Sequence, residues 1–446
     1  MTGCVRTKAF LLAAGLGTRL RPLTEWLPKC LVSVAGRPLL EWWLDLLDHA
    51  GIREGVINTH AHAERVERYL DTVADLHPVH LRTSYEPRLL GSAGAIAANH
   101  ELADGADDVV LINADNFCNV DLPALLAYHR SHTDPITMVL NHVENPSACG
   151  IARLDGEQRV VSFVEKPKQP ESNLANAGIY VVRAGAYREI ARMGAFDLGH
   201  DVIPCFVGRM RGWMWQGYHR DIGTPQALQR ARKEAVRLTI AGKPVQPLRR
   251  PAVFFDRDGT LIEDVPYLSR PERVRLQPGA AEALRTLREA GYLCVVVTNQ
   301  SGIGRGLYTE SDMRRVNEAM AAQLQAEGAY LDGLYHCAVV PRGDSRITVE
   351  NYMRKPGPGM LLKAAHDLEL NLDACWMVGD MISDVLAGQN AACRGNILLG
   401  SSDRTQELIR HRVHGVVAPD LMTATRTILE GTPALHPCRP PVAVQH

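Results

Sequence analysis

The sequence predicts an α/β fold in two domains, and three observations lead to this prediction. Short apolar segments alternate with segments of helical spacing, which is typical of a sheet covered by helices. A junction rich in proline, glycine and arginine, 241–250, separates two parts of domain size. Each part begins with an apolar strand that runs directly into small and charged residues. We therefore expect domains over 1–240 and 251–431, and a disordered proline-rich tail over 432–446.

Composition restricts the class of protein. The 446 residues suffice for two large or three smaller domains, and 46% hydrophobic residues support sizeable cores. The 49 lysine and arginine residues nearly balance the 50 acidic residues, so no nucleic-acid or membrane partner is predicted. No leader is visible, and no segment has the ~18 apolar residues of a membrane span. Ten scattered cysteines without Cys-x-x-Cys indicate a reducing compartment, so we expect a cytoplasmic protein.

The first candidate site follows the strand at 9–14. A turn of small residues, 15–18, comes directly after it, and three basic side chains follow: Arg19, Arg21 and Lys29. Glycines let backbone N–H groups approach an anion, and arginine presents forked donors that match phosphate oxygens. A strand, a glycine turn and three cations together describe a triphosphate cradle, although Gly-x-Gly by itself is more often a plain tight turn. The motif is not a P-loop, because no Gly-Lys-Ser/Thr follows, and it lacks the third glycine of a dinucleotide fingerprint.

The longer string Gly-x-Gly-Thr-Arg-x-Arg-Pro-Leu-Thr, with Pro-Lys behind it, resembles the signature of the sugar-1-phosphate nucleotidyltransferases. The resemblance covers roughly residues 6–240 and implies a Rossmann-like domain with a GT-A-like mixed sheet. It implies catalytic roles for Arg19 and Lys29. It also implies nucleotide contacts from four residues of the loop: Ala14, Gly15, Gly17 and Thr18.

The segments that follow are predicted to alternate between helix and strand. Apolar residues at helical spacing predict helices over 39–50 and 63–70, with a strand over 55–58 between them. A small-residue segment, Leu-Gly-Ser-Ala-Gly-Ala, then begins a helix. Its Gly91 and Gly94 allow either close packing of helix on sheet or a nucleobase or sugar lying flat on the backbone. The segment resembles the base-contacting segment of the nucleotidyltransferases, which favours the second interpretation.

Two aspartates in this half are candidate magnesium ligands. The apolar strand within 107–119 leads to Asp115, and open α/β sheets place ligands at the carboxyl ends of strands. Carboxylates suit magnesium that bridges to substrate phosphates. Ala114 stands where the family usually has glycine. The string Gly-Tyr-His-Arg-Asp-Ile-Gly-Thr-Pro resembles the segment that carries the family's second metal aspartate, here Asp221, and implies Mg²⁺ held by both.

The acceptor sugar phosphate has its own candidate motif. Phe-Val-Glu-Lys-Pro is by itself a surface turn, but its place in the order of motifs favours a resemblance to the family's Glu-Lys-Pro. The resemblance implies that Lys166 holds the phosphate and that Glu165 contacts sugar hydroxyls. Asn-Ala-Gly-Ile-Tyr follows, with Asn176 and Gly178 as further substrate contacts. The sugar phosphate would attack the α-phosphorus of a nucleoside triphosphate without a protein nucleophile, because alignment and electrostatics suffice.

The second half opens with Asp-Arg-Asp-Gly-Thr after an apolar strand. This string resembles the first motif of the haloacid-dehalogenase-like (HAD-like) phosphotransferases. A calcium loop is the competing interpretation, but the later glutamate of that pattern is missing. The resemblance implies a HAD-like Rossmannoid phosphatase with a minimal cap. In it, Asp256 would form an aspartyl-phosphate and Asp258 would act as general acid and base.

Three further motifs follow in the order of that family. A strand over 293–297 ends at Thr298 and Asn299, which would hold the phosphate, and Lys355 supplies a cation. Another strand ends in Asp380, with Asp384 just beyond it. The resemblance implies a second Mg²⁺ with Asp384 in a supporting position and three ligands: Asp256, Asp258 and Asp380.

Within that superfamily, the strings around Asp256 and Thr298 look like the heptose 1,7-bisphosphate 7-phosphatases, and histidinol-phosphatases share much of them. Both groups usually carry a Cys/His zinc loop. Here Asn351 and Met353 stand where a Cys-x-Cys pair would, so we expect no structural zinc and a loop over 341–353 that is held by packing.

Two arginines near this loop, Arg305 and Arg354, are candidates for contacts with a second phosphate or with the sugar. Together the two halves suggest consecutive steps with small-molecule substrates. Heptose 1,7-bisphosphate would lose its 7-phosphate, and heptose 1-phosphate would then receive a nucleotidyl group. The heptose pairing favours GTP, although Leu-Ala-Ala-Gly at the loop start looks more like uridylyl- and thymidylyltransferases.

Two alternatives stay open. One is a transferase for another sugar 1-phosphate, using UTP, dTTP, CTP or ATP, beside a histidinol-phosphate-like phosphatase. The other is a regulatory protein that senses sugar nucleotides. Five intact charged residues argue against a sensor, which needs no metal pair: Arg19, Lys29, Asp115, Lys166 and Asp221.

Overall fold

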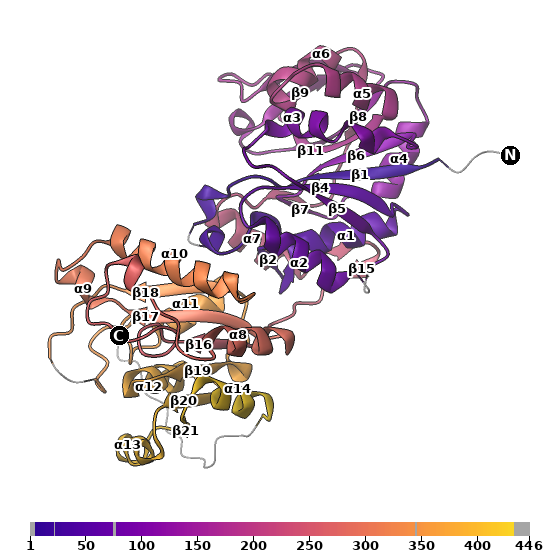
Figure 1. The fold of residues 1–446 in the computed structure, drawn as a ribbon. Coiled ribbons are helices and arrows are strands. Elements are labelled where there is room, and N and C mark those ends of the chain that lie inside the picture. Colours follow the sequence, from indigo (N-terminus) through magenta and orange to yellow (C-terminus); the bar gives the residue numbers. More distant parts are fainter. Residues whose placement is uncertain (1–4, 22, 75–76, 344–345, 432–446) are drawn as a thin grey trace. The chain divides into compact units, whose positions relative to one another are not determined.

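A computed structural model describes residues 5–21, 23–74, 77–343 and 346–431. The chain divides into two compact units, and the division falls between Pro247 and Leu248 (Figure 1). Just before it, a short hairpin pairs β14 (Thr239–Ile240) with β15 (Lys243–Pro244), so part of the segment predicted as a linker has regular structure. The predicted disordered tail, 432–446, lies outside the described residues.

The first unit is built on a mixed sheet of nine strands. Four neighbouring strands run parallel, and β11 joins them antiparallel to β6. The strand order across the sheet is β10 (Val160–Glu165), β9 (Gly150–Leu154), β11 (Leu174–Arg183), β6 (Asp108–Asn113), β1 (Thr7–Leu12), β4 (Glu54–Thr59) and β5 (His80–Tyr85). The other two strands branch from this order, because β8 (Ile136–His142) pairs with β11 and with β12 (Met210–Met214). The mixed sheet expected for this half is therefore confirmed.

Both faces of this sheet are covered, because side chains alternate along each strand. In β1, Ala9 and Leu11 enter one apolar core, whereas Phe10 enters the core on the opposite face. The first core contains residues of α1 (Leu39–His49), α2 (Ala63–Val73), α4 (Leu122–Arg130) and α7 (Pro225–Ala235), and the second contains residues of α3 (Gly91–Ala98), α5 (Ala184–Arg192) and α6 (Ile203–Phe206). The helices predicted over 39–50 and 63–70 are confirmed as α1 and α2.

The first unit also contains a separate antiparallel pair of strands, called the ribbon below. It joins β7 (Asn116–Cys118) to β13 (His219–Asp221), which are about a hundred residues apart in sequence. Phe117 anchors the ribbon, because its buried ring packs edge-on against Trp42 and Tyr218. A second small hairpin pairs β2 (Ser33–Val34) with β3 (Arg37–Pro38).

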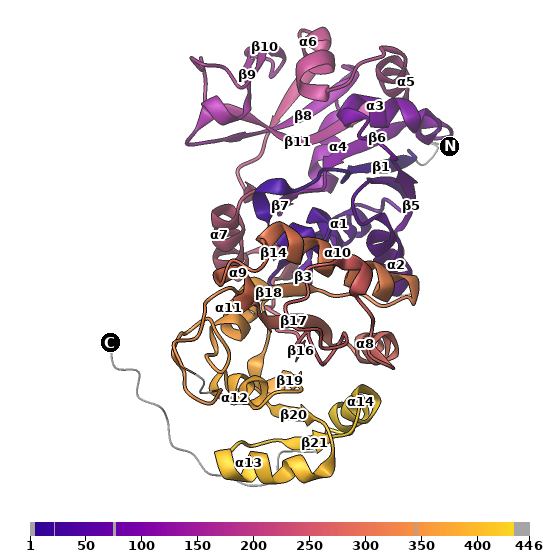
Figure 2. The ribbon, with the colours of Figure 1, turned by 60° about the vertical axis from the view of Figure 1, so that its left-hand side comes forward.

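The second unit is a parallel sheet of six strands, seen in succession in Figure 2. Its order is β18 (Gly333–Cys337), β17 (Leu293–Asn299), β16 (Ala252–Phe255), β19 (Trp376–Gly379), β20 (Gly395–Leu399) and β21 (Val416–Ala418). The accompanying helices are α8 (Ala280–Glu289), α9 (Ser301–Gly304), α10 (Glu310–Ala326), α11 (Gly359–Asp367), α12 (Ile382–Asn390), α13 (Thr405–His411) and α14 (Leu421–Leu429). The first strand in sequence, β16, is central, so the later strands lie on both sides of it.

This order brings distant motifs together at one edge. The carboxyl ends of β16, β17 and β19 are adjacent, because Phe255 pairs with both Val296 and Val378. Residues that follow these three strands therefore meet in the crevice where such sheets bind ligands. Among the described residues of either unit, we find no helix with the length and apolar character needed to cross a membrane.

Candidate active sites

In the first unit, three charged side chains meet at one point. The Lys29 ammonium lies 2.7 Å from an oxygen of Asp115 and 3.0 Å from an oxygen of Asp221. Its side chain is 8% exposed, whereas those of Asp115 and Asp221 are 41% and 53% exposed. Two carboxylates that share one ammonium form an acidic pair. Their oxygens are the donors that magnesium prefers.

The ribbon explains why these acids meet. Asp221 is the last residue of β13 and pairs with Asn116, the residue directly after Asp115. Two backbone hydrogen bonds reinforce the junction, because the N–H of Ile222 donates to the Asp115 carbonyl and that of Gly223 donates to the Asp221 carboxylate. Arg19 lies 3.9 Å from Asp221, and its side chain is 69% exposed, far more than that of Lys29.

A cavity of about 460 Å³ lies beside this charge cluster. It is walled by the ends of β1, β4, β5 and β6 and by the start of α3. The predicted site residues that line it are Ala14, Gly15, Lys29, Gly91, Asp115, Glu165 and Asn176. The predicted residues that lie outside its lining are Gly17, Thr18, Arg19, Gly94, Lys166, Gly178 and Asp221.

Packing explains two of the glycines for which a ligand contact was expected. At Gly91, φ is +76° and an added Cβ would lie 2.3 Å from the backbone oxygen of Phe196. At Gly178, φ is +68° and an added Cβ would lie 2.4 Å from the Asn113 side chain. Both positions therefore require glycine for conformation and close approach, whatever is bound. Gly91 also lines the cavity, so packing and ligand contact are compatible there.

The acceptor motif has one inward and one outward residue. Glu165 lines the cavity and its carboxylate lies against Gly150 and Gly199, where a Cβ would come within 2.5 and 2.9 Å of it. Lys166 is 62% exposed, lies 3.5 Å from Glu165, and has a φ of +47°. A non-glycine residue in the left-handed region is uncommon and is frequently found at functional sites.

Sequence analysis assigned no role to two cavity residues, Asn58 and Glu86. Glu86 is 2% exposed, and its carboxylate accepts hydrogen bonds from the Asn58 amide at 2.8 Å and from the N–H of Leu90 at 2.9 Å. Asn58 in turn accepts from the N–H of Ala13 at 2.6 Å, beside the glycine loop. A signal was present, because both residues lie at the carboxyl ends of parallel strands, β4 and β5.

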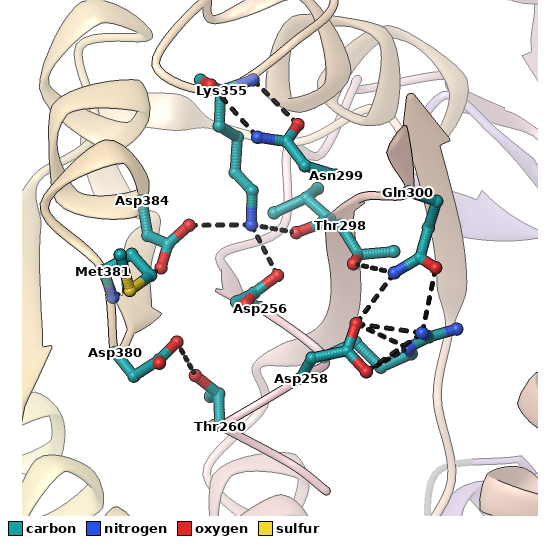
Figure 3. Close-up of polar contacts among 12 residues, drawn as sticks. Asp256, Asp258, Thr260, Thr298, Asn299, Gln300, Lys355, Asp380, Met381 and Asp384 are labelled. Atoms are coloured by element: carbon teal, nitrogen blue, oxygen red, sulfur yellow. Dashed lines mark hydrogen bonds and ion pairs between the residues drawn. The ribbon is translucent and has the colours of Figure 1, made fainter. Parts of the chain in front are cut away.

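In the second unit, Lys355 is the hub of the site (Figure 3). Its ammonium donates to Asp256 at 2.5 Å and to the Val297 carbonyl at 2.7 Å, and it lies 2.8 Å from Asp384. Asn299 fixes the lysine backbone through two hydrogen bonds of 3.1 Å, one in each direction. Lys355 thus links the predicted nucleophile, Asp256, to Asn299, one of the predicted phosphate-binding residues.

Burial controls the electrostatics of the acids. Burial raises the pKa of Asp256, Lys355 lowers it and Asp384 raises it, and the net result is a pKa of about 8. Burial, followed by the charge of Asp384, raises the pKa of Asp380 to about 6. For Lys355, burial lowers the pKa, but Asp256 and Asp384 outweigh this effect and the net shift is upward. One ammonium does not balance this group of carboxylates, so an additional cation would stabilise their charged forms.

Three of these acids converge. Asp256, Asp380 and Asp384 each offer an oxygen, and the three oxygens lie within 4.8 Å of one another. Asp258, predicted as one of the three metal ligands, does not belong to this set, because Arg257 binds both of its carboxylate oxygens at 2.9–3.2 Å. Asp384, predicted in a supporting position, belongs to the converging set.

These groups line a cavity of about 700 Å³. Thr298, Asn299, Arg305 and Arg354 are all in its wall, as predicted substrate contacts. The described part of the loop over 341–353 is held by hydrogen bonds at Asn351, whose side chain accepts from the N–H groups of Met353 and Arg354. Asn351 thus orders the backbone where a Cys/His zinc loop would have a ligand.

Comparisons with known proteins show what each half is similar to. The model of the nucleotidyl transferase family matches residues 8–237, and that of a HAD-hydrolase-like family matches residues 352–424. The mannose-1-phosphate guanylyltransferase catalytic subunit beta of Drosophila pseudoobscura is 34% identical over 223 residues, which are 49% of this chain and 60% of that protein. The chain therefore spans less than two thirds of that relative.

Two bacterial relatives match the second half. The D-glycero-alpha-D-manno-heptose-1,7-bisphosphate 7-phosphatase of Burkholderia mallei is 40% identical over 160 residues, 36% of this chain and 85% of that protein. The D-glycero-beta-D-manno-heptose-1,7-bisphosphate 7-phosphatase of Pasteurella multocida is 40% identical over 148 residues, 33% of this chain and 80% of that protein.

Proposed function

This chain belongs to the nucleotidyl transferase family, and its second half is a HAD-like phosphatase domain, so we propose that it makes a nucleotide-activated heptose in two consecutive steps. The second unit hydrolyses the 7-phosphate of D-glycero-D-manno-heptose 1,7-bisphosphate. The first unit then joins the remaining heptose 1-phosphate to GMP from GTP and releases pyrophosphate. We expect both steps to take place in the cytoplasm. The observation that carries the proposal is that each unit gathers acids and a buried lysine beside a cavity.

In the transfer step, a phosphate oxygen of heptose 1-phosphate attacks the α-phosphorus of GTP, and the bond from that phosphorus to the bridging oxygen of pyrophosphate breaks. Lys29 and Arg19 neutralise charge on the triphosphate, and the backbone at Gly15, where no atom lies near an added Cβ, is open to it. Lys166 and Glu165 position the acceptor. Asp115 and Asp221 would hold Mg²⁺, which when bound stabilises charge on the phosphates as a Lewis acid.

Glu86 supports GTP as the nucleotide. A carboxylate is an acceptor-only group, and guanine presents two adjacent donors, N1–H and the 2-amino group, on one edge. Uracil and thymine present one donor flanked by two carbonyl oxygens, which a carboxylate repels. Because Glu86 lines the cavity and is fixed by Asn58 and Leu90, its free lone pairs form a rigid acceptor for guanine.

In the hydrolysis step, Asp256 attacks the 7-phosphorus and the bond to the sugar oxygen breaks. Asp258 gives a proton to that oxygen and later takes one from the water that cleaves the aspartyl-phosphate, so both residues return to their starting state. Lys355, Thr298 and Asn299 hold the phosphoryl oxygens. Asp256, Asp380 and Asp384 would hold a second Mg²⁺, which when bound reduces the repulsion between carboxylate and phosphate.

The test is product analysis with matched single-site variants of the full chain. Purified protein with heptose 1,7-bisphosphate, GTP and MgCl₂ is expected to yield GDP-heptose, phosphate and pyrophosphate by mass spectrometry. Asp256→Asn should lose phosphate release by ~10²-fold or more but still convert heptose 1-phosphate, and Asp115→Asn should show the reverse. Failure of the wild-type chain to form GDP-heptose, or loss of both activities in one variant, would contradict the proposal.

A further inference from the structure

The amide of Gln300 connects four side chains beside the phosphatase site. It is 3% exposed, and both its oxygen and its nitrogen have two partners. The oxygen accepts from Arg257 at 3.0 Å and from the Tyr308 hydroxyl at 2.6 Å. The nitrogen donates to Asp258 at 2.8 Å and to Thr298 at 2.9 Å (Figure 3). Gln300 thus joins a phosphate-binding hydroxyl to the acid–base carboxylate.

The chemistry of the neighbours fixes the direction of this amide. The guanidinium of Arg257 can only donate hydrogen bonds, so the atom of the Gln300 amide that faces it must be the oxygen. The NH₂ group of Gln300 must therefore face Asp258. Arg257 is itself 1% exposed and is anchored by Asn317 at 2.8 Å, so the arrangement rests on a fixed group.

The donated hydrogen bonds have two consequences for the site. Because Gln300 donates to the Thr298 oxygen, Thr298 keeps its own hydroxyl hydrogen for another acceptor, and Thr298 lines the cavity that contains Asp256. Because Gln300 also binds Asp258, it and Arg257 hold that carboxylate at one place in the cavity wall. A change in the amide would therefore disturb the phosphate grip and the acid–base group together.

We propose that Gln300 is a positioning residue for phosphate-ester hydrolysis, which directs the Thr298 hydroxyl hydrogen toward the phosphoryl oxygens and orients Asp258 toward the leaving oxygen. The inference rests on the phosphatase half of the proposed function. The sequence motifs predicted no role for Gln300, which lies in the cavity wall with its amide bonded to Arg257, Tyr308, Asp258 and Thr298.

The test uses Gln300→Glu in the full chain, because this change keeps the side-chain shape and the oxygen that accepts from Arg257. It removes the two hydrogen bonds donated to Asp258 and Thr298 and places a second carboxylate beside Asp258. Heptose 1,7-bisphosphate and p-nitrophenyl phosphate are compared by kcat/KM, which reports the steps up to transfer of the phosphoryl group. We expect a loss of roughly 10–100-fold for the sugar phosphate, whose leaving oxygen needs a proton, and a clearly smaller loss for the aryl ester. Inhibition by inorganic phosphate should weaken several-fold, because Thr298 is misdirected.

Two further variants separate positioning from folding. Gln300→Leu removes all four hydrogen bonds and should show the same difference between the two esters. Gln323→Leu in α10 is the matched control, because it removes one glutamine hydrogen bond, to the Val274 carbonyl, away from the cavity. In this control, kcat/KM for both esters and inhibition by phosphate should be unchanged.

The outcomes are distinguishable from failure of the proposed function. If the wild-type chain hydrolyses neither ester, the phosphatase assignment itself is wrong. Gln300 has no positioning role if the wild-type chain is active and Gln300→Glu retains full activity. The same conclusion follows if Gln300→Glu loses activity on both esters equally, in proportion to the loss of folded protein measured by circular dichroism.

Discussion

Single buried charges decide much of the behaviour of this protein, and Glu86 is the first example. If its carboxylate binds guanine, Glu86→Gln loses one acceptor and gains a donor at that edge. We expect kcat/KM for GTP to fall about tenfold or more, since a good paired contact to a base contributes ~1–3 kcal/mol of discrimination. ITP lacks the 2-amino group, so kcat/KM for ITP should fall less in Glu86→Gln than kcat/KM for GTP. An initial-rate comparison of GTP, ITP and UTP measures this, with the exposed Glu101→Gln as control; unchanged GTP preference would remove Glu86 from base selection.

The second example is the acidic cluster around Asp256. Its pKa of about 8 in the folded chain lies well above the ~4 of an unfolded aspartate, so between these values the folded state binds more protons. The stability of the metal-free protein should therefore fall as pH rises from about 4 to 8. MgCl₂ favours the charged forms, so its stabilising effect should be larger at pH 8 than at pH 5.

Thermal unfolding of the second unit in EDTA and in MgCl₂ across this range measures the effect. Asp256→Asn removes one of the two titrating carboxyls, so the pH dependence in EDTA should become weaker, and the pKa of about 6 of Asp380 accounts for what is left. A metal-free melting temperature that rises steadily from pH 5 to pH 8 would contradict the electrostatic argument.

At the scale of elements, the ribbon of β7 and β13 assembles the first site. Phe117→Ala removes the ring between Trp42 and Tyr218, which should cost about 3–5 kcal/mol and loosen the alignment of Asp115 with Asp221. Nucleotidyl transfer should fall at least tenfold at a temperature where the chain stays folded, whereas phosphate release should not change. Phe206→Ala is the matched control, because Phe206 is equally buried but lies in the core on the other face. Equal losses of transfer in both variants would show that the ribbon has no special role.

At the scale of the whole molecule, each unit has its own sheet and its own core. Fragments 1–247 and 248–446 should therefore fold when expressed separately, and each should retain its own activity. Calorimetry should show one transition for each fragment, at temperatures close to two transitions of the full chain. Aggregation of either fragment, or loss of its activity, would show that the units depend on each other.

The sequence by itself determined the α/β class, and its motifs resembled those of the two families. The predicted site residues come from local signals, because an apolar strand that ends in glycine, acid or hydroxyl predicts both an element and a ligand edge. Helices α1 and α2, the mixed sheet, and the placement of Lys355 beside Asp256 agree with that prediction. The resemblance of the segment around Asp221 to the family's second metal aspartate predicted that Asp115 and Asp221 belong together.

Only the tertiary structure decided which of these groups meet and how they are held. Asp384 converges with Asp256 and Asp380, whereas Asp258 turns to Arg257. Gly91 and Gly178 are explained by neighbours that are distant in sequence, Phe196 and Asn113. The roles of Glu86 and Gln300 come from hydrogen bonds across several strands and loops. Sequence patterns report the periodicity of one segment, but side-chain direction depends on packing between segments, and no local pattern records that.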